Sequence, residues 1–471
     1  MTKSREKRAA KAAREKTIWP QEPTQYSVSK ELREEDERVE KNTLGQNKRV
    51  LFLIDKYDQR PYIGGVCVRN VAGALRDEGV ETHILAFQAE GACPENEKPY
   101  VHYFTPGIIE RLFLYAEQKN ESALEKLAFR TAQCLSKTRK LVMLHWYPED
   151  TVRLPRTIVR HIEKLDLQYR FDAVISVQSR ISFSVAGYLW KKKHPDRVWL
   201  MYCVDSYADG NPIRFISDRR RIEGGKQLDR KVLELVDQFY MVECHKSFYE
   251  QPYYDEFRQK IQYVDIPLYL PKQLDSPTAV PQQTKGKWVY AGSLHEFGYN
   301  PWKLCEVFLH LPDADGRTLF FFSRGNCESK LKKLSEKSGG RIVSSGYISA
   351  ERLKTELRSA DVLVSIGIEN SSQVSGKIFD YFCNLKRVVH FSSGNGDPNL
   401  PYLKKYPYSF CATKDSELDQ TVQELSTFLK QPIEPDEKTK AEIDRLFLKN
   451  QPSYAAGLIK SYIEKENAHY E

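Results

Sequence analysis

Short runs of apolar, mostly β-branched residues alternate with longer segments of helical spacing through the first half of the chain. The runs predict strands at Arg49–Ile54, Thr82–Ala86, Val101–Phe104, Ala173–Val177, Val198–Tyr202, Gln238–Met241 and Gln262–Asp265. The longer segments predict helices at Val66–Glu78, Leu124–Ser136, Pro155–Leu165, Ile181–Lys193 and Arg219–Leu235. Because this alternation is typical of parallel doubly wound sheets, we expect one Rossmann-like α/β domain here.

The composition changes between Pro267 and Gly286 to Pro, Gln, Lys, Thr and Ser, which predicts a linker. A second series follows, with strands predicted at Trp288–Ala291, Thr318–Ser323, Arg341–Val343, Val362–Ile366, Val388–Phe391 and Tyr408–Ala412. Its helices are predicted at Pro301–His310, Glu328–Ser338, Ala350–Ser359 and Gly376–Cys383, with an amphipathic final helix at Tyr454–Glu466. The expected parts are an N-terminal extension (1–46), a first domain (47–270), a linker (271–287), a second domain (288–450) and a C-terminal helix (451–471). Two such sheets joined by a linker predict a cleft.

The stretch from Ala360 to Phe391 carries the strongest chemical signal. Its strand run ends at Gly367, a polar loop follows, and a helix is predicted to begin at Ser375-Gly376-Lys377, with N-terminal amides at Val374 to Gly376. The unpaired amides and positive dipole at a helix start favour an anion, and the Lys377 ammonium adds a mobile charge. Asp380, one turn later, is placed to accept hydrogen bonds from sugar hydroxyls. The pattern therefore predicts a nucleoside-diphosphate ligand.

Three further features are candidates for the same chemistry. Arg324 is predicted to lie in a loop with Gly325, just past the strand Thr318–Phe322, where its guanidinium can grip two phosphate oxygens. Gly64 and Gly65 come directly before a predicted helix and let the backbone approach a ligand. Asp205 follows a predicted strand and is a candidate base or acceptor-orienting group. The structural alternatives are a surface arginine, a plain turn, and a capping or buried aspartate.

The segment DVLVSIG…NSSQVSGKIFDYF…K resembles the donor-site signature of GT-B glycosyltransferases of the family-four type in bacteria. The Gly64-Gly65 loop, WLMYCVDSYADGNP from Trp199 to Pro212, YAGSL from Tyr290 to Leu294 and FFSRGNCE from Phe321 to Glu328 agree in order. The resemblance covers roughly Arg49 to Tyr462. It implies two Rossmann-like domains facing a cleft, a C-terminal helix crossing back to the first domain, retention of anomeric configuration and no obligatory metal.

The residue chemistry and the resemblance together give a set of candidate site residues. The candidate catalytic residues are Asp205, Arg324 and Lys377. The implied donor-binding residues are Gly64, Gly65, Gly292, Ser293, Arg324, Gly325, Asn326, Val374, Ser375, Gly376, Lys377 and Asp380. The chain departs from the family at two places, because Ser372 replaces a second Glu and the loop SLHEFGYNP offers His295 and Tyr299 instead of an Arg and a Lys. Sugar recognition is in doubt there, and phosphate binding is expected to depend more on Arg324 and Lys377.

Composition describes a globular protein with 41% hydrophobic and 12% aromatic residues among 471. The formal charge is +8, and residues 1–16 hold seven basic against two acidic side chains, an excess of five. This basic head is a candidate for attraction to an anionic membrane surface, the alternative being a solvated terminus. With no long apolar stretch and a charged N-terminus, a cytoplasmic protein is expected, peripheral at the inner face of the membrane if the head binds there. Nine scattered cysteines without a Cys-x-x-Cys pair argue against disulfides and a zinc site.

Other functions remain open at this stage. The same fold serves nucleotide-sugar epimerases, and the departures from the family also suit a degenerate domain that binds a partner glycosyltransferase or glycan without turnover. A nucleic-acid binder is disfavoured because basic charge is concentrated in the head. Asp313-Ala314-Asp315 is interpreted as turn chemistry beside Pro312 and Gly316, and Cys244-His245 as structural.

Overall fold

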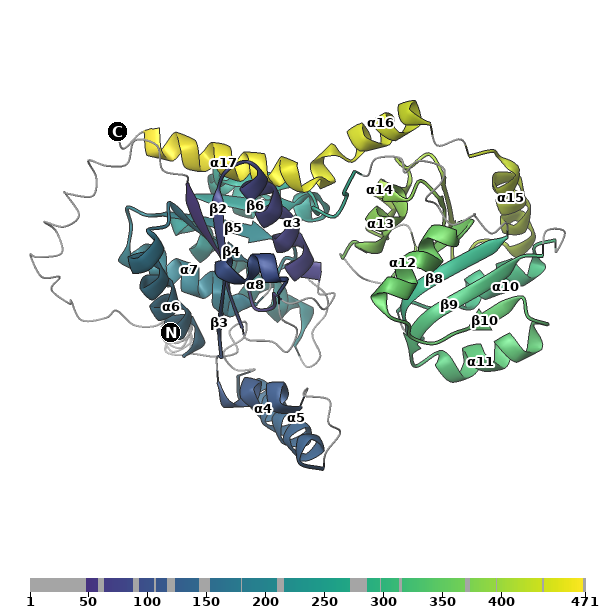
Figure 1. Cartoon of the computed structure of the whole chain (residues 1–471), viewed down its shortest axis with the longest axis horizontal. Helices are drawn as coiled ribbons and strands as arrows, with labels where there is room; N and C mark the ends of the chain where they lie inside the picture. The colour runs from purple at the N-terminus through teal and green to yellow at the C-terminus, as the bar shows by residue number, and fades with distance from the viewer. Residues whose placement is uncertain are drawn as a thin grey trace, which may run out of the picture. The chain divides into compact units, whose positions relative to one another are not determined.

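The computed structural model describes residues 48–57, 63–87, 93–105, 107–116, 123–143, 153–178, 180–209, 216–271, 286–296, 298–312, 316–368, 373–394, 396–433 and 436–468. The N-terminal extension, most of the predicted linker, the Asp313–Asp315 turn and Ser372 lie outside these residues. The described residues form two compact units, one drawn from within 1–264 and 455–471 and the other from within 265–454. Each is an α/β unit built on one parallel sheet (Figure 1).

The first unit has a seven-stranded sheet in the order β3-β2-β1-β4-β5-β6-β7. Its strands are β1 (Arg49–Leu53), β2 (Glu81–Phe87), β3 (Val101–Phe104), β4 (Ala173–Val177), β5 (Val198–Cys203), β6 (Gln238–Val242) and β7 (Ile261–Val264). Its helices are α3 (Ile63–Asp77), α4 (Ile108–Ala116), α5 (Ala123–Met143), α6 (Leu154–Tyr169), α7 (Ile181–Lys193), α8 (Asp218–Leu235) and α9 (Lys246–Tyr249), with short 3₁₀ turns at Glu95–Tyr100, Glu243–His245 and Pro252–Lys260. The strand order reverses between β1 and β4.

The second unit has a six-stranded sheet in the order β10-β9-β8-β11-β12-β13, with its reversal between β8 and β11. The strands are β8 (Lys287–Leu294), β9 (Thr318–Gly325), β10 (Ile342–Ser344), β11 (Val362–Ile366), β12 (Arg387–Ser392) and β13 (Ser409–Thr413). The helices are α10 (Trp302–His310), α11 (Glu328–Lys337), α12 (Ala350–Ser359), α13 (Lys377–Cys383), α14 (Leu400–Leu403), α15 (Leu418–Lys430) and α16 (Glu437–Leu446), followed by a 3₁₀ turn at Leu448–Asn450. The predicted two-domain architecture is confirmed.

Burial on both faces explains why the strand runs are continuously apolar rather than alternating. Every residue of β4, β5, β6 and β11 is buried, as expected for parallel strands covered by helices. Side-chain caps fix several helix starts, because Ser217 accepts from the Arg220 amide and Ser349 from the Arg352 amide. None of the helices in the described part of the chain combines the length and apolar character needed to cross a bilayer.

The C-terminal helix α17 (Pro452–Ala468) returns to the first unit, as the fold prediction required (Figure 1). Lys460 Nζ donates to the Glu78 carbonyl over 2.9 Å, and the Tyr240 hydroxyl donates to the Leu458 carbonyl over 3.3 Å. These contacts join α17 to the end of α3 and to the sheet. The helix therefore belongs structurally to the first unit although it follows the second in sequence.

Residues 265–270 group with the second unit, whereas the sequence placed them in the first domain. The Tyr402 hydroxyl donates to Asp265 over 2.7 Å, and the Tyr269 hydroxyl donates to Asp444 over 2.6 Å. Because these partners all come from the second unit, the chain passes between units at Val264 and Asp265 rather than in the Pro-rich segment. The apparent linker composition did not reveal this.

Candidate functional site

The candidate site lies at the carboxyl edge of the second sheet, where β8 and β11 diverge. In doubly wound sheets the crevice outside the strand ends at the reversal point is the usual place for a ligand. Here the edge is formed by the end of β8, by the described residues of the loop leading to α10, and by residues 373–376, which precede α13. The sequence motif therefore falls at the position that this topology favours.

Lys377, the first residue of α13, places its ammonium group among aromatic rings. Its Nζ lies 5.8 Å from the centre of the Tyr290 ring and 5.6 Å from that of the Tyr299 ring. Burial lowers the pKa of Lys377 to about 8, and no carboxylate among the described residues acts to raise it. In the part of the chain that the structure describes, this ammonium group therefore has ring faces beside it and no carboxylate, which suits an anionic ligand as its counter-charge.

Gly292 and Lys377 lie directly against each other. A β-carbon added at Gly292 would be 1.9 Å from the Lys377 Nζ and 3.5 Å from the Tyr290 hydroxyl oxygen. Gly292 also has φ +146°, a backbone conformation that side chains other than glycine rarely adopt. The glycine of the YAGSL segment thus makes the space that the lysine fills.

A buried network that the sequence did not reveal holds the segment before α13. Asp397, which is 4% exposed, accepts hydrogen bonds from the Asn399 backbone and side chain over 2.9 and 2.7 Å, and its Oδ2 lies 3.1 Å from His390 Nε2. Burial raises the pKa of Asp397, but the bonds from His390 and Asn399 outweigh it, so the net shift is downward. Asn399 Oδ1 in turn accepts from the Ser375 amide over 2.7 Å.

This network corrects one part of the helix-start prediction. The Ser375 amide is already bonded to Asn399, so it is not available to an anion as expected. The neighbouring Val374 is buried at 6% exposure, and the first residue of α13 is Lys377 rather than Gly376. The network fixes the backbone that leads into α13, and through it the position of the Lys377 side chain.

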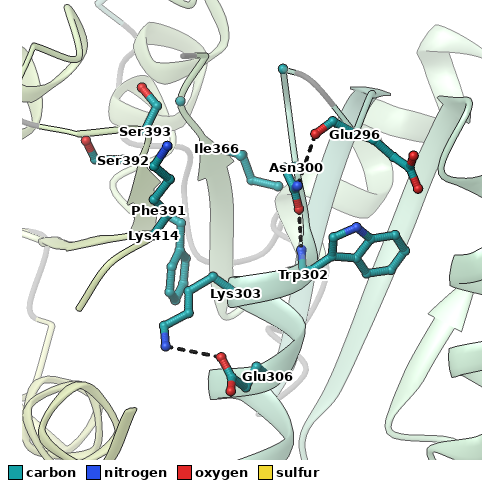
Figure 2. Close-up of a pocket in the computed structure, with 12 residues that line it drawn as sticks. Glu296, Asn300, Trp302, Lys303, Glu306, Ile366, Phe391, Ser392, Ser393 and Lys414 are labelled. Carbon is teal, nitrogen blue, oxygen red and sulfur yellow. Dashed lines mark hydrogen bonds and ion pairs between the residues drawn. The ribbon is translucent and has the colours of Figure 1, made fainter. Parts of the chain in front are cut away.

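A cavity of about 510 Å³ opens at the same edge. Ile366 and Gly367 from the end of β11, and Phe391 and Ser392 from the end of β12, line it, and α10 supplies Trp302, Lys303 and Glu306 (Figure 2). Lys303 and Glu306 form an ion pair of 3.1 Å across its wall. Gly298 and Asn300 also line the cavity, and Tyr299 between them covers Lys377, so one loop serves both features. The volume suits a small organic ligand.

Arg324 is placed differently from the prediction. It lies within β9, opposite Ser293 of β8, rather than in a loop, and its exposed guanidinium sits 5.3 Å from the centre of the Tyr347 ring. Gly325 ends the strand with φ +137°, close against the Leu294 carbonyl. Arg324 is therefore near the carboxyl edge, but the structure shows no contact between it and Lys377 within the described residues.

The remaining predicted donor residues have mainly local roles in the structure. Asn326 Oδ1 accepts from the Glu296 amide over 3.0 Å, which ties the loop after β8 to the end of β9. The Ser293 carbonyl accepts from the Tyr290 hydroxyl over 2.8 Å, which orients one of the rings beside Lys377. Asp380 is exposed on α13, while Lys377 is partly buried, so the two side chains do not share one environment.

In the first unit, Gly64 and Gly65 lie inside the first turn of α3 and are buried, rather than preceding the helix. Asp205 follows β5 and is partly buried. Burial, and then the negative charge of Asp205, raise the pKa of the Cys67 thiol on α3. Burial, and then the charges of Asp229 and Asp205, raise the pKa of the Cys203 thiol. The structure therefore brings Asp205 and the start of α3 to the same edge of the first sheet.

A second unexpected network orders the loop that carries Asp205. His245 Nδ1 donates to Asp209 over 2.8 Å, and His245 Nε2 accepts the Ser206 amide over 3.3 Å. The Ser206 hydroxyl lies 3.1 Å from the Tyr249 hydroxyl, which donates to the buried Asp229 over 2.9 Å. The structural interpretation of His245 agrees with these contacts. Among the described residues, no three His, Cys, Asp or Glu side chains are grouped to hold a metal ion.

Solved structures with the same architecture extend over nearly the whole chain. The N-terminal domain of Candida albicans trehalose-6-phosphate phosphatase aligns with a TM-score of 0.55 at 11% identity, covering 94% of this chain and 100% of that one. A putative UDP-N-acetylglucosamine 2-epimerase from Listeria monocytogenes aligns with a TM-score of 0.51 at 10% identity, covering 89% and 98%. The fold is GT-B.

A third structure of this GT-B fold is a variant of S. aureus TarM in complex with fondaparinux, alpha-GlcNAc-glycerol and UDP, with a TM-score of 0.51 at 10% identity, covering 90% of this chain and 99% of that one. At such identities the likeness concerns the fold alone. No protein-family profile matches the sequence, and no curated protein matches it significantly. The reaction must therefore be argued from the site.

Proposed function

We propose that this protein is a glycosyltransferase that moves a sugar from a nucleoside-diphosphate sugar to a glycan or lipid-linked glycan, in cell-surface polysaccharide or glycoconjugate synthesis. The observation that carries the proposal is Lys377, an ammonium group whose pKa burial lowers to about 8 at the reversal point of the second sheet. A bound diphosphate would supply a counter-charge, which no described carboxylate provides. The same charge then stabilises the phosphate as it leaves the anomeric carbon.

The other residues of this edge take complementary roles in the proposal. The cavity beside the loop of Tyr299 would hold the nucleoside, since its lining combines the apolar residues Ile366 and Phe391 with polar groups. Arg324 is proposed as a second cation for phosphate oxygens, and Asp380 as the partner of a ribose hydroxyl. Resemblance in sequence is the basis for proposing retention of configuration without an obligatory metal.

The acceptor is proposed to bind the first unit. Asp205 stands at the carboxyl edge of that sheet beside the start of α3, and its loop is anchored by Ser206 and His245. A carboxylate held in this way is suited to orienting an acceptor hydroxyl. The contacts of Ser206 support a fixed position for the Asp205 backbone.

A thermal-shift panel of nucleoside diphosphates and nucleotide sugars tests the donor site. At least one ligand should raise the melting temperature of the wild type, and Lys377→Ala should reduce that shift strongly. Arg324→Ala should reduce it less, since its side chain is exposed. Lys332→Ala, at an exposed position on α11, serves as the control. If every nucleotide leaves the wild-type melting temperature unchanged, the donor-site assignment is wrong.

Product analysis separates the reactions that this fold supports, because one similar structure is titled an epimerase. A glycosyltransferase releases a nucleoside diphosphate in step with a new glycosidic bond to an added acceptor. An epimerase changes the configuration of the sugar without needing an acceptor, and a degenerate binding domain gives a thermal shift without any turnover. Only the first result supports the proposal in full.

A further inference from the structure

Helices α4 and α5 form a hairpin that stands apart from the other helices of the first unit (Figure 1). The two helices pack through the Phe113 and Phe129 rings, whose centres are 5.9 Å apart, and through a bond of 3.1 Å from Arg139 to Glu110. Glu110 also lies 3.7 Å from Arg180, at the start of α7. The hairpin follows the end of β3 and is thus attached at the carboxyl edge of the first sheet.

Exposed apolar side chains are concentrated on this hairpin. Of the eleven large hydrophobic residues that are exposed in the described part of the chain, six belong to α4 and α5. They are Ile108, Tyr115, Leu124, Leu127, Phe129 and Leu135. Leu124 and Leu127 are 66% and 61% exposed, so these side chains project into solvent rather than filling gaps in the helix pair. A concentration of this kind usually marks an interaction surface.

Most of the exposed residues of α5 form two stripes at helical spacing, and Ala123, Phe129 and Gln133 belong to neither. One stripe is uncharged and consists of Leu124, Leu127, Thr131, Cys134, Leu135 and Thr138. The other is cationic and consists of Lys126, Arg130 and Lys137, at spacings of four and seven residues. The opposite face, with Ala128 and Ala132, is buried. A helix of 21 residues therefore presents an apolar stripe with a row of positive charges along one side.

The solvent-exposed charges on the described part of the hairpin are all positive. Every charged side chain that is exposed on the described parts of α4 and α5 is basic: Arg111, Lys126, Arg130 and Lys137. The two carboxylates are turned inward, since Glu110 pairs with Arg139 and Glu125 is 6% exposed. The partner of this surface must therefore be negatively charged and must also accept apolar side chains.

We propose that the α4–α5 hairpin docks the protein on the surface of an anionic lipid bilayer. Leu124, Leu127 and Leu135 enter the boundary between headgroups and acyl chains, and the cationic stripe contacts lipid phosphates. A nucleic acid would meet the charges but offers no place for three leucines. A second copy of the hairpin would cover the leucines but bring like charges together. The docking needs no nucleotide, so it stands apart from the proposed function.

Sedimentation of the full-length protein with lipid vesicles tests this docking. Binding should occur to vesicles of phosphatidylcholine mixed with phosphatidylglycerol, be much weaker to phosphatidylcholine alone, and fall as salt is raised. Leu127→Asp should lower the partition coefficient roughly tenfold or more. The matched control is Leu167→Asp on α6, where the leucine is 71% exposed, and it should bind as the wild type does. Melting temperatures confirm that each variant folds.

The cationic stripe is tested in the same assay. The pair Lys126→Ala and Arg130→Ala should lower the partition coefficient roughly tenfold, whereas Lys332→Ala with Lys333→Ala on α11 should not. The proposal is overturned if the hairpin variants bind as the wild type does, or if replacing the seven basic residues of 1–16 with Gln abolishes binding that the hairpin variants keep. It is also overturned if the wild type does not bind anionic vesicles. A lower oligomeric mass of Leu127→Asp than of the wild type would then indicate that the hairpin binds a second copy of the chain. The nucleotide-induced shift should survive in Leu127→Asp, so the two proposals fail separately.

Discussion

The α-carbon of Gly292 faces the ammonium group of Lys377 so closely that a methyl group at position 292 would lie 1.9 Å from Nζ. The two residues are 85 positions apart and come from a strand end and a helix start. Their contact converts two separate sequence motifs into one arrangement. A substitution at Gly292 can therefore displace the Lys377 ammonium group while the lysine itself is retained.

Gly292→Ala should weaken nucleotide binding by displacing the Lys377 ammonium group. The expected result is a thermal shift with the best nucleotide that is reduced nearly as much as in Lys377→Ala. Gly394→Ala is the control, because Gly394 has a similar φ of +150° but open space around the added methyl group. Both variants should lose stability from backbone strain, of the order of 1 to 3 kcal/mol. Equal loss of nucleotide response in the two variants would contradict the role of the contact.

Nucleotide affinity should fall as the pH rises through about 8. Burial lowers the pKa of Lys377 to about 8, so above this pH the free protein increasingly holds a neutral amine. A bound diphosphate favours the charged form, so binding should be accompanied by proton uptake near pH 8. Calorimetry in two buffers of different ionisation enthalpy measures this uptake. Lys377→Met should bind the nucleotide more weakly and without this proton uptake. Proton uptake that persists in Lys377→Met would show that a group other than Lys377 takes up the proton.

The stability of the first unit should depend on Asp229 between about pH 4 and pH 7. Burial raises the pKa of Asp229 to about 7, while bonds from Tyr249 and Tyr254 partly offset this. In the unfolded chain the carboxyl loses its proton near pH 4, so the unfolded state binds fewer protons in this window and stability falls as the pH rises. The loss is at most about 4 kcal/mol. Urea unfolding at several pH values should show a flatter dependence for Asp229→Asn and an unchanged one for Asp196→Asn, at an exposed position.

Asn399→Ala should disturb the site without touching the cation. It removes the acceptor of the Ser375 amide and a donor to the buried Asp397, so it should cost roughly 1 to 3 kcal/mol of folding free energy. The nucleotide-induced shift should also fall, because the segment before Lys377 loses its anchor. Asn384→Ala removes one bond at the other end of α13 and should leave the nucleotide response intact. A response that survives in Asn399→Ala would show that α13 is held by packing alone.

The fold was largely predictable because its strands are buried on both faces. The bounds of β11, α7 and α12 agree with the sequence prediction. A continuous apolar run marks β11, and the Ser349 cap marks the start of α12. Helices α4, α9, α14, α15 and α16 were not predicted. The start of α15 is capped by Glu417, whose carboxylate accepts from the amides of residues 419 and 420, and a glutamate is not a usual signal of a helix start.

The site was predictable only where chemistry follows a local motif. Lys377 and Gly292 lie in such motifs, and the structure brings them together. The bonds of Asp397 were hidden, because they join His390, Asn399 and, through it, Ser375 across a loop that has no recognisable pattern. The prediction for Arg324 was wrong in its secondary structure. Arg324 lies near the end of a strand, whereas the sequence analysis assigned it to the loop that follows.

The passage at Val264 and Asp265 changes what the Pro-rich segment can do. Residues 271 and 286, which flank that segment, both belong to the second unit, so the segment leaves and rejoins the same body. The chain crosses from the first unit to the second at residues 264–265 and returns at residues 454–455. Residues next to the two crossings are hydrogen-bonded: the Asn450 side chain donates to the Ile266 carbonyl over 3.3 Å, and the Asn450 carbonyl accepts from the Tyr269 amide over 3.0 Å. Both crossings between the units therefore begin near one hydrogen-bonded stretch of the second unit, and an insertion in the Pro-rich segment should change the length of neither crossing.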